Sequence, residues 1–478
     1  MILYLLGRIL TVEAVLMAPS AAMAAFYGEG DLFAFLITMA LLVAVGLPFS
    51  LRKPADSAIY AREGMVTVAL AWVFMSAFGA LPLVISGAIP SYVDALFEIA
   101  SGFTTTGASI LSEVESLPSG VLFWRSFSHW VGGMGVLVFV MAVLPMSEDR
   151  SMVLMRAEVP GPTASKLVPR MRTTAKILYG TYSAMTVVLI VLLLLGGMPA
   201  FDAVCTAMGT AGTGGFCVRN IGIAYYDSAY IDVVLSVFML LFSINFNLYY
   251  LILIRRVREA VRSEELRWFL GVVACATVVI TLCILPQYGQ VGQSLRYAFF
   301  QVSSIISTTG FATADFALWP VLAQEVLLVL MFIGACAGST GGGIKASRFA
   351  IACKSFGAEI HHVLHPRAVT VVRLDGKAVE KETITGTRNY IIGSLLILTL
   401  VTLLIAVDGF DFTTNFSATL ACFSNIGPGL AQVGPMSNFG AYSPFSKILL
   451  TITMLTGRLE VFPIVLMLSP RTWRRSGN

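Results

Sequence analysis

The sequence has 478 residues, of which 57% are hydrophobic and only 12% are charged, and its formal net charge is +4. A soluble domain carries about 25% charged residues, so this composition excludes an ordinary soluble protein. Apolar runs of roughly 20 residues recur along the chain, and each is long enough to cross a bilayer as a helix. They predict an all-α polytopic membrane protein, because a transmembrane β-barrel would show alternating segments of about ten residues.

Basic and acidic residues are divided between alternate loops. The basic residues cluster at Arg52 to Arg62, Arg150 to Lys176, Arg255 to Arg267, Lys345 to Arg388, and Arg471 to Arg475. The positive-inside rule places these clusters in the cytoplasm. The acidic loops then face outward, where they would raise the local cation concentration. We interpret the basic clusters as topology signals and expect the lipid bilayer, not nucleic acid, as the surrounding partner.

Two apolar spans lead the chain, at residues 2–26 and 31–51. Four units of one layout follow, at 64–146, 174–256, 266–360 and 386–470. Each unit has a first span, a short apolar segment, a stretch rich in Gly and Thr, and a second span. The first spans are 64–88, 174–197, 268–286 and 389–407. The short segments are Asp94 to Phe103, Phe201 to Gly209, Leu295 to Ile306, and Phe412 to Cys422. The second spans are 121–145, 229–254, one beginning over 318–337, and 445–468.

This layout predicts two leading helices and four pseudo-symmetric repeats, each a helix, a pore helix, a filter loop and a helix, around a central pore. Regular repetition of this kind is typical of an internally repeated fold. The predicted crossings are even in number, so both termini lie on one side, which the charge pattern makes cytoplasmic.

The four Gly-Thr stretches are the candidate ion site. A helix that enters the membrane and turns back leaves polar backbone at depth, which is tolerated only where it is buried or lines water. Four such loops that face one another can replace the hydration shell of a cation with carbonyl oxygens, and glycine allows the backbone conformations this needs. The predicted filter residues are Thr105, Thr106, Gly107, Thr213, Gly214, Thr308, Thr309, Gly310, Asn425, Ile426 and Gly427.

The ligand type indicates which ion this site would hold. Each short helix runs inward, so the negative end of its dipole favours a cation at the membrane centre. Hard oxygen ligands suit an alkali ion, and the stretches carry no carboxylate ring of the kind that suits Ca²⁺. Glycine and threonine also occur at ordinary helix-packing interfaces, but packing glycines need not all follow a short helix that does not span.

A second candidate region lies in the third unit. Gly338, Ser339, Thr340, Gly341, Gly342, Gly343 and Lys345 stand in a stretch that fails the phosphate-loop pattern, because Ile344 takes the lysine position. Low helix propensity over 338–344 predicts a mobile intramembrane loop, with a simple kink or helix end as the alternative. Arg458, near the middle of the last span, is predicted to reach this loop and hold the pore closed, and Lys345 could share the role. The alternative is that Arg458 snorkels to the interface. Glu460 lies on another helical face and is a poor partner.

Other chemistry is weakly indicated. His361 and His365 could share a helical face and bind a metal, although a solvated cluster is the simpler interpretation. Gly28-Glu29-Gly30-Asp31 matches the GxGD string of intramembrane aspartyl proteases but lies in a loop. No HExxH or GxSxG string is present, so we expect no enzyme activity. A bond between Cys205 and Cys217 stays open.

The motifs closely resemble the Trk/Ktr/HKT superfamily of potassium transporters, in particular its TrkH/TrkG-type membrane subunit. The resemblance covers nearly the whole chain. It rests on residues 103–108, 211–216, 307–311 and 424–428, with Trp130 to Gly135 and Gly457 to Glu460. It implies filter glycines at Gly107, Gly214, Gly310 and Gly427, and it makes the 338–344 loop the expected gate. Glycine rather than serine at Gly107 favours K⁺ over Na⁺, and Asn425-Ile426 predicts weaker coordination in the fourth quadrant.

The resemblance also implies partners. It predicts a homodimer in the bacterial cytoplasmic membrane, with a TrkA-like ring of RCK-domain subunits docked on its cytoplasmic side. The chain lacks a Rossmann fingerprint, so nucleotide would act only through that ring. Loops 148–176 and 345–388 are the expected docking surface. A Na⁺-conducting or cation-symporting relative, a non-conducting sensor subunit and a membrane enzyme remain as alternatives.

Overall fold

The computed structural model describes residues 1–52, 61–135, 171–368 and 370–473. Within these ranges the regular structure is helical apart from one small antiparallel hairpin, β1 (Arg373–Leu374) and β2 (Lys377–Ala378). The N-terminal helices are α1 (Ile2–Leu16), α2 (Ala18–Tyr27) and α3 (Leu32–Leu51). Helices α1 and α3 cross closely, since a Cβ on Gly7 would lie 2.6 Å from the Gly46 carbonyl oxygen. Small residues at a crossing allow such close backbone approach in membranes.

Four repeats follow. Repeat 1 contains α4 (Ala61–Gly79), α5 (Leu81–Ile85), α6 (Tyr92–Phe103) and α7 (Ser119–Gly133). Repeat 2 contains α10 (Met171–Leu195), α11 (Ala200–Gly212), η1 (Gly222–Tyr226), α12 (Ala229–Phe242) and α13 (Phe246–Leu253), and α14 (Val257–Arg262) leads on from it. Repeat 3 contains α15 (Glu264–Tyr288), α16 (Val291–Ile306), η2 (Phe316–Leu318), α17 (Val321–Ile333) and α18 (Ala346–Leu364). Repeat 4 contains α19 (Lys381–Ile405), η3 (Ala406–Asp408), α20 (Phe412–Ser424), η4 (Ala431–Val433), α21 (Pro444–Arg458), α22 (Phe462–Leu468) and α23 (Pro470–Trp473).

The long spans confirm the predicted multi-pass architecture. In the described part of the chain, 6 continuous helices are long and apolar enough to cross a membrane. They are Ile2–Tyr27, Leu32–Leu51, Arg62–Ile85, Thr173–Leu195, Glu264–Tyr288 and Lys381–Asp408. These are the two leading spans and the first helix of every repeat.

The second helices differ from the prediction, because the expected continuous spans 229–254 and 445–468 are broken. Helices α12 and α13 meet at a 91° bend. Between α21 and α22, Glu460 and Val461 have positive φ values of 56° and 71°. In repeat 3 the non-helical segment runs from Gly334 to Lys345, so it begins earlier than the predicted 338–344 loop. The predicted span 121–145 is helical to Gly133, and its part beyond residue 135 lies outside the described residues.

These breaks are stable at membrane depth because they are buried in protein. Ser243 and Asn245 in repeat 2 and the glycines of residues 334–345 in repeat 3 lower helix propensity, and in repeat 4 Pro463 cannot continue the preceding helix. Neighbouring backbone provides missing hydrogen-bond partners. For example, the amide of Cys336 donates to the Ser243 carbonyl at 3.0 Å, so the repeat-3 break pairs with the repeat-2 break. The prediction from hydropathy included the residues at these breaks in continuous spans, and it therefore missed the breaks.

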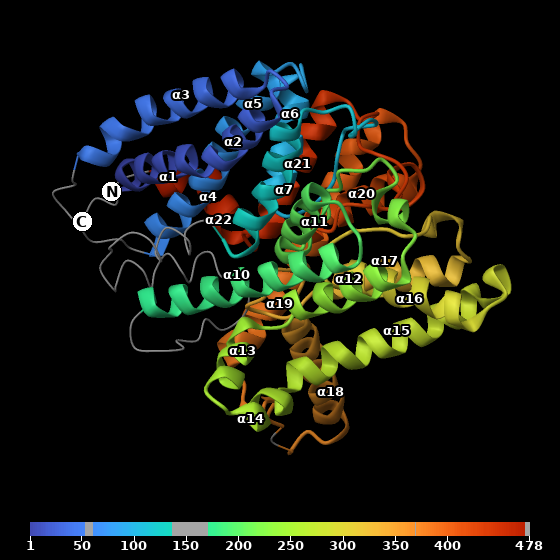
Figure 1. Cartoon of the computed structure of the whole chain (residues 1–478). Coiled ribbons are helices and arrows are strands. Elements are labelled where there is room, and N and C mark those ends of the chain that lie inside the picture. Colours follow the sequence, from blue (N-terminus) through green and yellow to red (C-terminus); the bar gives the residue numbers. More distant parts are fainter. Residues whose placement is uncertain (53–60, 136–170, 369, 474–478) are drawn as a thin grey trace, which may run out of the picture.

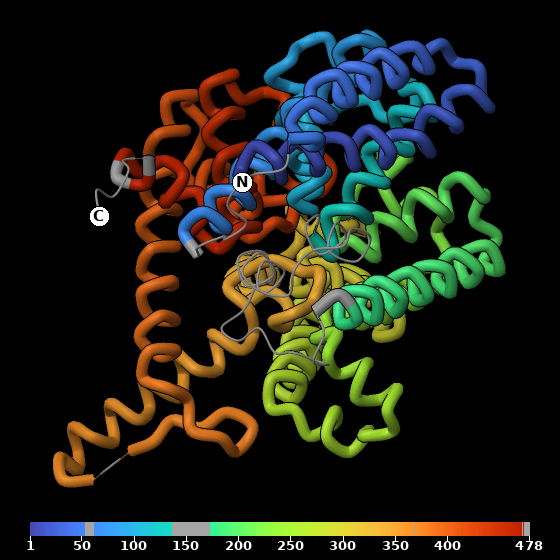
Figure 2. The backbone as a smooth tube through the Cα atoms, turned by 90° about the vertical axis from the view of Figure 1, so that its left-hand side faces the viewer, coloured from blue at the N-terminus to red at the C-terminus, as the bar shows by residue number. Residues whose placement is uncertain are grey.

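The repeats close into a ring through contacts between neighbouring repeats, whose helices are labelled in Figure 1. The short helices α6, α11, α16 and α20 each pack against the second helix of the preceding repeat. The contacting pairs are α7 with α11, α12 with α16, α17 with α20, and α21 with α6. Figure 2 shows α18 and the hairpin region extending away from this ring (orange, lower left). The four glycine-rich loops therefore meet inside the ring, where the short helices end.

Candidate ion pore

Four loops of equivalent conformation follow the short helices. We name them the glycine loops, residues 105–107, 213–215, 308–310 and 425–427. The first residue of each has a left-handed conformation, with φ of 55° at Thr105, 56° at Thr213, 61° at Thr308 and 56° at Asn425. Left-handed backbone is uncommon for residues other than glycine. Its recurrence at four equivalent positions shows that the loops are copies of one structure.

Each glycine loop caps its short helix in the same way. In repeat 1 the Thr106 amide donates to Ser101 O at 2.8 Å, and the Thr105 amide donates to Gly102 O at 3.1 Å. The three other repeats make the equivalent pair of amide-to-carbonyl bonds. In repeat 2 Gly214 donates to Gly209 and Thr213 to Thr210, and in repeat 3 Thr309 donates to Ser304 and Thr308 to Ile305. In repeat 4 Ile426 donates to Ala421 and Asn425 to Cys422. This is the Schellman arrangement, which satisfies the last helical carbonyls and turns the chain sharply.

The glycine at the third position corrects the predicted register of repeat 2. The third residues have φ of 77° at Gly107, 79° at Gly215, 84° at Gly310 and 97° at Gly427. Gly215, not Gly214, is thus the structural equivalent of the other three glycines. Gly214 corresponds to Thr106, Thr309 and Ile426. A sequence signal for this register was available, because Gly215-Phe216 aligns with Gly310-Phe311 of repeat 3.

The four loops form a closed ring at the level of these glycines. A Cβ added to any one of them would collide with the carbonyl oxygen of the second loop residue in the next repeat. The colliding pairs are Gly107 with Gly214 O, Gly215 with Thr309 O, Gly310 with Ile426 O, and Gly427 with Thr106 O. Each repeat therefore presents one carbonyl at an equivalent place. Such a ring of backbone oxygens is the arrangement that replaces the water shell of an alkali ion.

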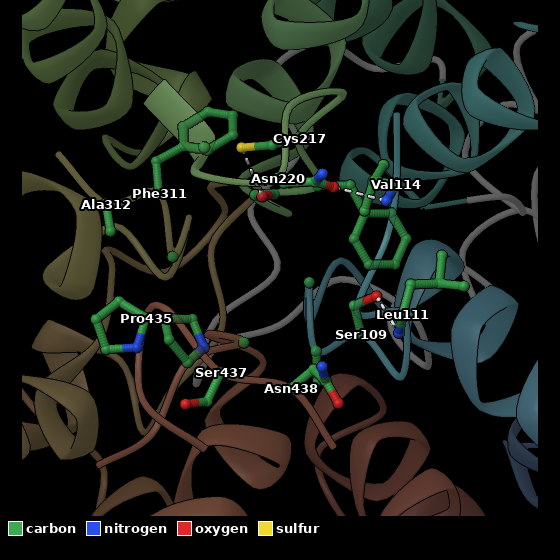
Figure 3. A pocket seen from close by; sticks show the side chains of 18 of the residues that line it. Ser109, Leu111, Val114, Cys217, Asn220, Phe311, Ala312, Pro435, Ser437 and Asn438 are labelled. Atoms are coloured by element: carbon green, nitrogen blue, oxygen red, sulfur yellow. Dashed lines mark hydrogen bonds between the residues drawn. The ribbon is translucent and has the colours of Figure 1, made fainter. Parts of the chain in front are cut away.

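A pocket of about 130 Å³, which we call the mouth pocket, opens onto this ring. All four loop glycines line it. Figure 3 looks into the pocket, with Ser109, Asn220, Ala312 and Ser437 contributed by repeats 1, 2, 3 and 4 in turn. The loops that follow the filter residues thus form a shared vestibule leading to the carbonyl ring.

One cation in the mouth pocket is paired. Arg219 lies 2.9 Å from Asp202 and 3.9 Å from Glu115. Tyr226 also donates to Asp202, at 2.6 Å. Burial raises the pKa of Tyr226 above its ordinary value, and the neighbouring Asp202 carboxylate raises it further. The hydroxyl therefore stays protonated, and the two carboxylates reduce the repulsion that Arg219 would exert on an entering cation.

A buried ion pair between Arg125 and Glu98 holds the segment that follows the first glycine loop. Arg125 donates to Glu98 through Nε at 2.9 Å and Nη2 at 2.7 Å, and both side chains are buried. Glu98 also accepts from the Ile110 amide at 3.0 Å. The Arg125 guanidinium lies 4.3 Å from the centre of the Phe216 ring, next to the second loop. Sequence reasoning missed this pair, although an arginine and a glutamate inside apolar segments were a usable signal.

His129 joins the first and second repeats. Its Nε2 accepts from the Phe216 amide at 3.2 Å, so Nδ1 carries the proton and donates to the Gly102 carbonyl at 2.8 Å. The ring is fully buried. This side chain links the end of α6 to the residue that follows the second glycine loop.

Replacing His129 with alanine is expected to lower K⁺ uptake several-fold and to reduce thermal stability. The Phe216 amide and the Gly102 carbonyl would both lose a buried partner, which costs about 1–3 kcal/mol each. Ion uptake by cells and the unfolding temperature of the purified protein measure the two effects. Leu403→Ala, at an exposed position of α19 outside the expected docking surface, is the control and should change neither. Unchanged uptake and stability in His129→Ala would contradict this role.

The fourth loop contacts the first through Asn425. Its side-chain amide donates to Thr106 Oγ1 at 2.9 Å and to Met454 O at 3.0 Å. Asparagine also tolerates the left-handed conformation well. The departure from threonine at this position therefore provides a contact between repeats 4 and 1. Weaker ion coordination in this quadrant stays a prediction.

The non-helical segment of repeat 3, residues 334–345, lies against the glycine loops. We name it the repeat-3 loop. The Gly342 amide donates to Thr308 Oγ1 at 2.7 Å. A Cβ on Gly341 would lie 2.8 Å from Ser307 O, and one on Gly342 would lie 3.1 Å from the Cβ of Asn425. The loop thus packs directly under the third and fourth glycine loops.

Arg458 is bonded to this loop, whereas its predicted role of holding the pore closed stays a prediction. Its guanidinium donates to Thr340 O at 2.8 Å, to Gly132 O at 2.6 Å and to Gly133 O at 2.7 Å. The side chain is only 7% exposed, which excludes snorkelling in this structure. Lys345 Nζ donates within the loop, to Gly341 O. Three repeats therefore meet at one buried cation.

The predicted separation of Arg458 from Glu460 is confirmed. Glu460 instead accepts from both terminal nitrogens of Arg348, at 2.9 and 2.5 Å. A cavity of about 10 Å³ lies between the repeat-3 loop and repeat 4. That space holds at most about one water molecule.

The weaker sequence signals have structural explanations. Among the described residues, no group of three His, Cys, Asp or Glu side chains is placed to hold a metal ion. Glu29 of the GxGD string accepts from the Ser119 amide at the start of α7, where a carboxylate is stabilised. Cys205 and Cys217 are both free thiols.

Comparison with known proteins is consistent across sequence and structure. The TrkH family, described as a cation transport protein, matches residues 32–475. The potassium uptake protein TrkG of Escherichia coli K12 is 34% identical over 98% of each chain, and TrkH of the same strain is 36% identical over 94% of each. The crystal structure of the potassium transporter TrkH from Vibrio parahaemolyticus matches with a TM-score of 0.90 and 31% identity, over 99% of each chain. The chain is a member of the TrkH family of cation transport proteins.

Proposed function

We propose that this protein takes up K⁺ across the bacterial cytoplasmic membrane through the ring of glycine loops. The observation that carries the proposal is the ring itself: four copies of one loop, each presenting a backbone carbonyl against the glycine of its neighbour. Carbonyl ligands without a carboxylate suit a monovalent cation. The printed names of the relatives, potassium uptake proteins, support K⁺ as that cation.

The repeat-3 loop is the gate in this proposal. Arg458 places a guanidinium below the filter, bonded to the Thr340 carbonyl, and Lys345 bonds to the Gly341 carbonyl within the loop. A cation leaving the filter would meet the charge of Arg458 and the closed loop. The structure then corresponds to a closed state, and opening requires that the loop move away from the glycine loops.

The mouth pocket faces the outside of the cell in this arrangement, and both termini face the cytoplasm. Opening would be controlled by a TrkA-like ring of RCK-domain subunits bound to a dimer of this chain, with nucleotide acting on the ring. Of the two loops predicted to dock it, 148–176 lies mostly outside the described residues. The other, 345–388, forms α18, the hairpin and the start of α19, which project from the ring of repeats (Figure 2).

Growth of K⁺-uptake-deficient bacteria at low K⁺ tests the proposal. Expression of the protein with its cognate partner should restore growth, and the same cells should grow equally at high K⁺ without it. Failure to restore growth, with the protein shown to be in the membrane, would contradict K⁺ uptake. Equal uptake of Na⁺ would instead indicate a Na⁺-conducting relative.

A further inference from the structure

One carboxylate bonds to Ala337 in the first part of the repeat-3 loop and to Ser347 just after its last residue. Glu265, in the first turn of α15, accepts through Oε1 from the Ala337 amide at 2.7 Å and from the Ser347 amide at 3.2 Å. Ala337 immediately precedes Gly338, and Ser347 lies in the first turn of α18. The side chain is 7% exposed. A buried carboxylate needs such donors, so these contacts fix the distance between the two ends of the loop.

The preceding residue is tied to the hairpin. Glu264 accepts from the Asp375 amide at 3.1 Å, and its own amide donates to Asp375 Oδ1 at 2.6 Å. Lys354 of α18 bonds to Glu264 and donates to the Arg373 carbonyl at 2.8 Å. The start of α15 is therefore bonded on one side to the loop ends and on the other to the hairpin.

A large cavity separates these two sets of contacts. Its volume is about 1100 Å³, and its lining includes Glu264, Glu265, Ala337, Ser347 and Asp375. The hairpin forms one wall and the ends of the repeat-3 loop form another. The cavity leaves room for the hairpin and the start of α15 to shift without first breaking a packed core.

We propose that the Glu264–Glu265 pair is the positioning link between the cytoplasmic hairpin and the gate. Glu265 holds the repeat-3 loop in its closed position by fixing its ends, and Glu264 transmits displacement of the hairpin to Glu265. The proposal rests on the proposed gating function of the loop. It assigns to the start of α15 a role separate from that of Arg458, which fastens the middle of the loop.

Replacing Glu265 with alanine tests the link in full-length protein in liposomes, without a partner subunit. Loss of two hydrogen bonds to a charged acceptor should raise basal rubidium flux by roughly tenfold. It should also speed hydrogen exchange over residues 334–347. Glu265→Gln keeps an acceptor oxygen and should restore most of the wild-type behaviour. Glu259→Ala is the matched control, because Glu259 lines the same cavity but is exposed, and among the described residues its carboxylate pairs with Arg256 rather than with the loop.

A second variant tests the contact between the hairpin and Glu264. Asp375→Ala should shift flux in the same direction as Glu265→Ala, and the double variant should show less than the product of the two effects, because both act through one link.

If Glu265→Ala leaves flux and exchange as in wild type while Arg458→Ala changes flux, the link is wrong and the gate stands. If neither changes flux in a protein that transports, the gating function fails, and the link fails with it. Independent effects of Asp375→Ala and Glu265→Ala would also overturn the link.

Discussion

Replacing Gly310 with serine is expected to lower K⁺ uptake by about tenfold or more. It should also weaken the discrimination of the filter against Na⁺. Gly310 has a φ of 84°, and a Cβ there would collide with Ile426 O and lie 2.8 Å from Pro428 Cδ. Strain of this kind costs about 1–3 kcal/mol before any collision is counted. The backbone must shift, and the carbonyl of Ile426, a member of the ring, shifts with it. Uptake of K⁺ and Na⁺ by K⁺-uptake-deficient cells measures both effects.

Gly292→Ala provides the matched control for this experiment. Gly292 lies in α16, the short helix that precedes the third glycine loop, and a Cβ there meets no atom within 4 Å. Its uptake should equal that of the wild type. If Gly310→Ser transports K⁺ as well and as selectively as Gly292→Ala, then Gly310 does not belong to the filter.

Replacing Arg458 with alanine is expected to raise K⁺ flux in the absence of the partner ring by about tenfold or more, since hydrogen bonds to a charged group contribute about 1.5–3 kcal/mol each. The variant frees the Thr340 carbonyl of the repeat-3 loop and removes positive charge below the filter. It also removes the bonds from Arg458 to the Gly132 and Gly133 carbonyls, so repeat 1 loses its contact with the residue that holds the loop. Flux into liposomes that contain only this protein is the measurement.

Lys447→Ala separates this gating effect from general loss of stability. Lys447 is a buried cation on the same helix, α21, but it pairs with Asp94 at 2.6 Å and does not contact the repeat-3 loop. It should lower the unfolding temperature without raising basal flux. Equal flux in Arg458→Ala and Lys447→Ala would remove the gating role of Arg458.

The short helices and glycine loops were predictable because they have local signals. A segment such as Phe412 to Ser424 is too short to span, and the polar loop after it is bounded by apolar helices. Repetition at four places made the combination specific. The same logic identified Arg458, because an arginine inside an apolar span needs a partner or water.

The contacts between repeats were not predictable to the same degree. Glu98 with Arg125 and Glu265 with Ala337 join positions that no sequence period relates. Adjacent glycines tolerate a positive φ equally well, so only the following phenylalanine, Phe216 in repeat 2 and Phe311 in repeat 3, marked Gly215 rather than Gly214. The broken second helices were missed because hydropathy averages over a window and does not register a few buried non-helical residues.

We propose that four carbonyls, those of Thr106, Gly214, Thr309 and Ile426, surround one K⁺ site. A crystal structure of the protein in rubidium, with anomalous scattering recorded, tests it most directly, because Rb⁺ is close to K⁺ in size and chemistry. The account predicts an anomalous peak on the axis of the ring, within coordination distance of these oxygens. Absence of a peak on that axis, in a protein that transports rubidium, would contradict it.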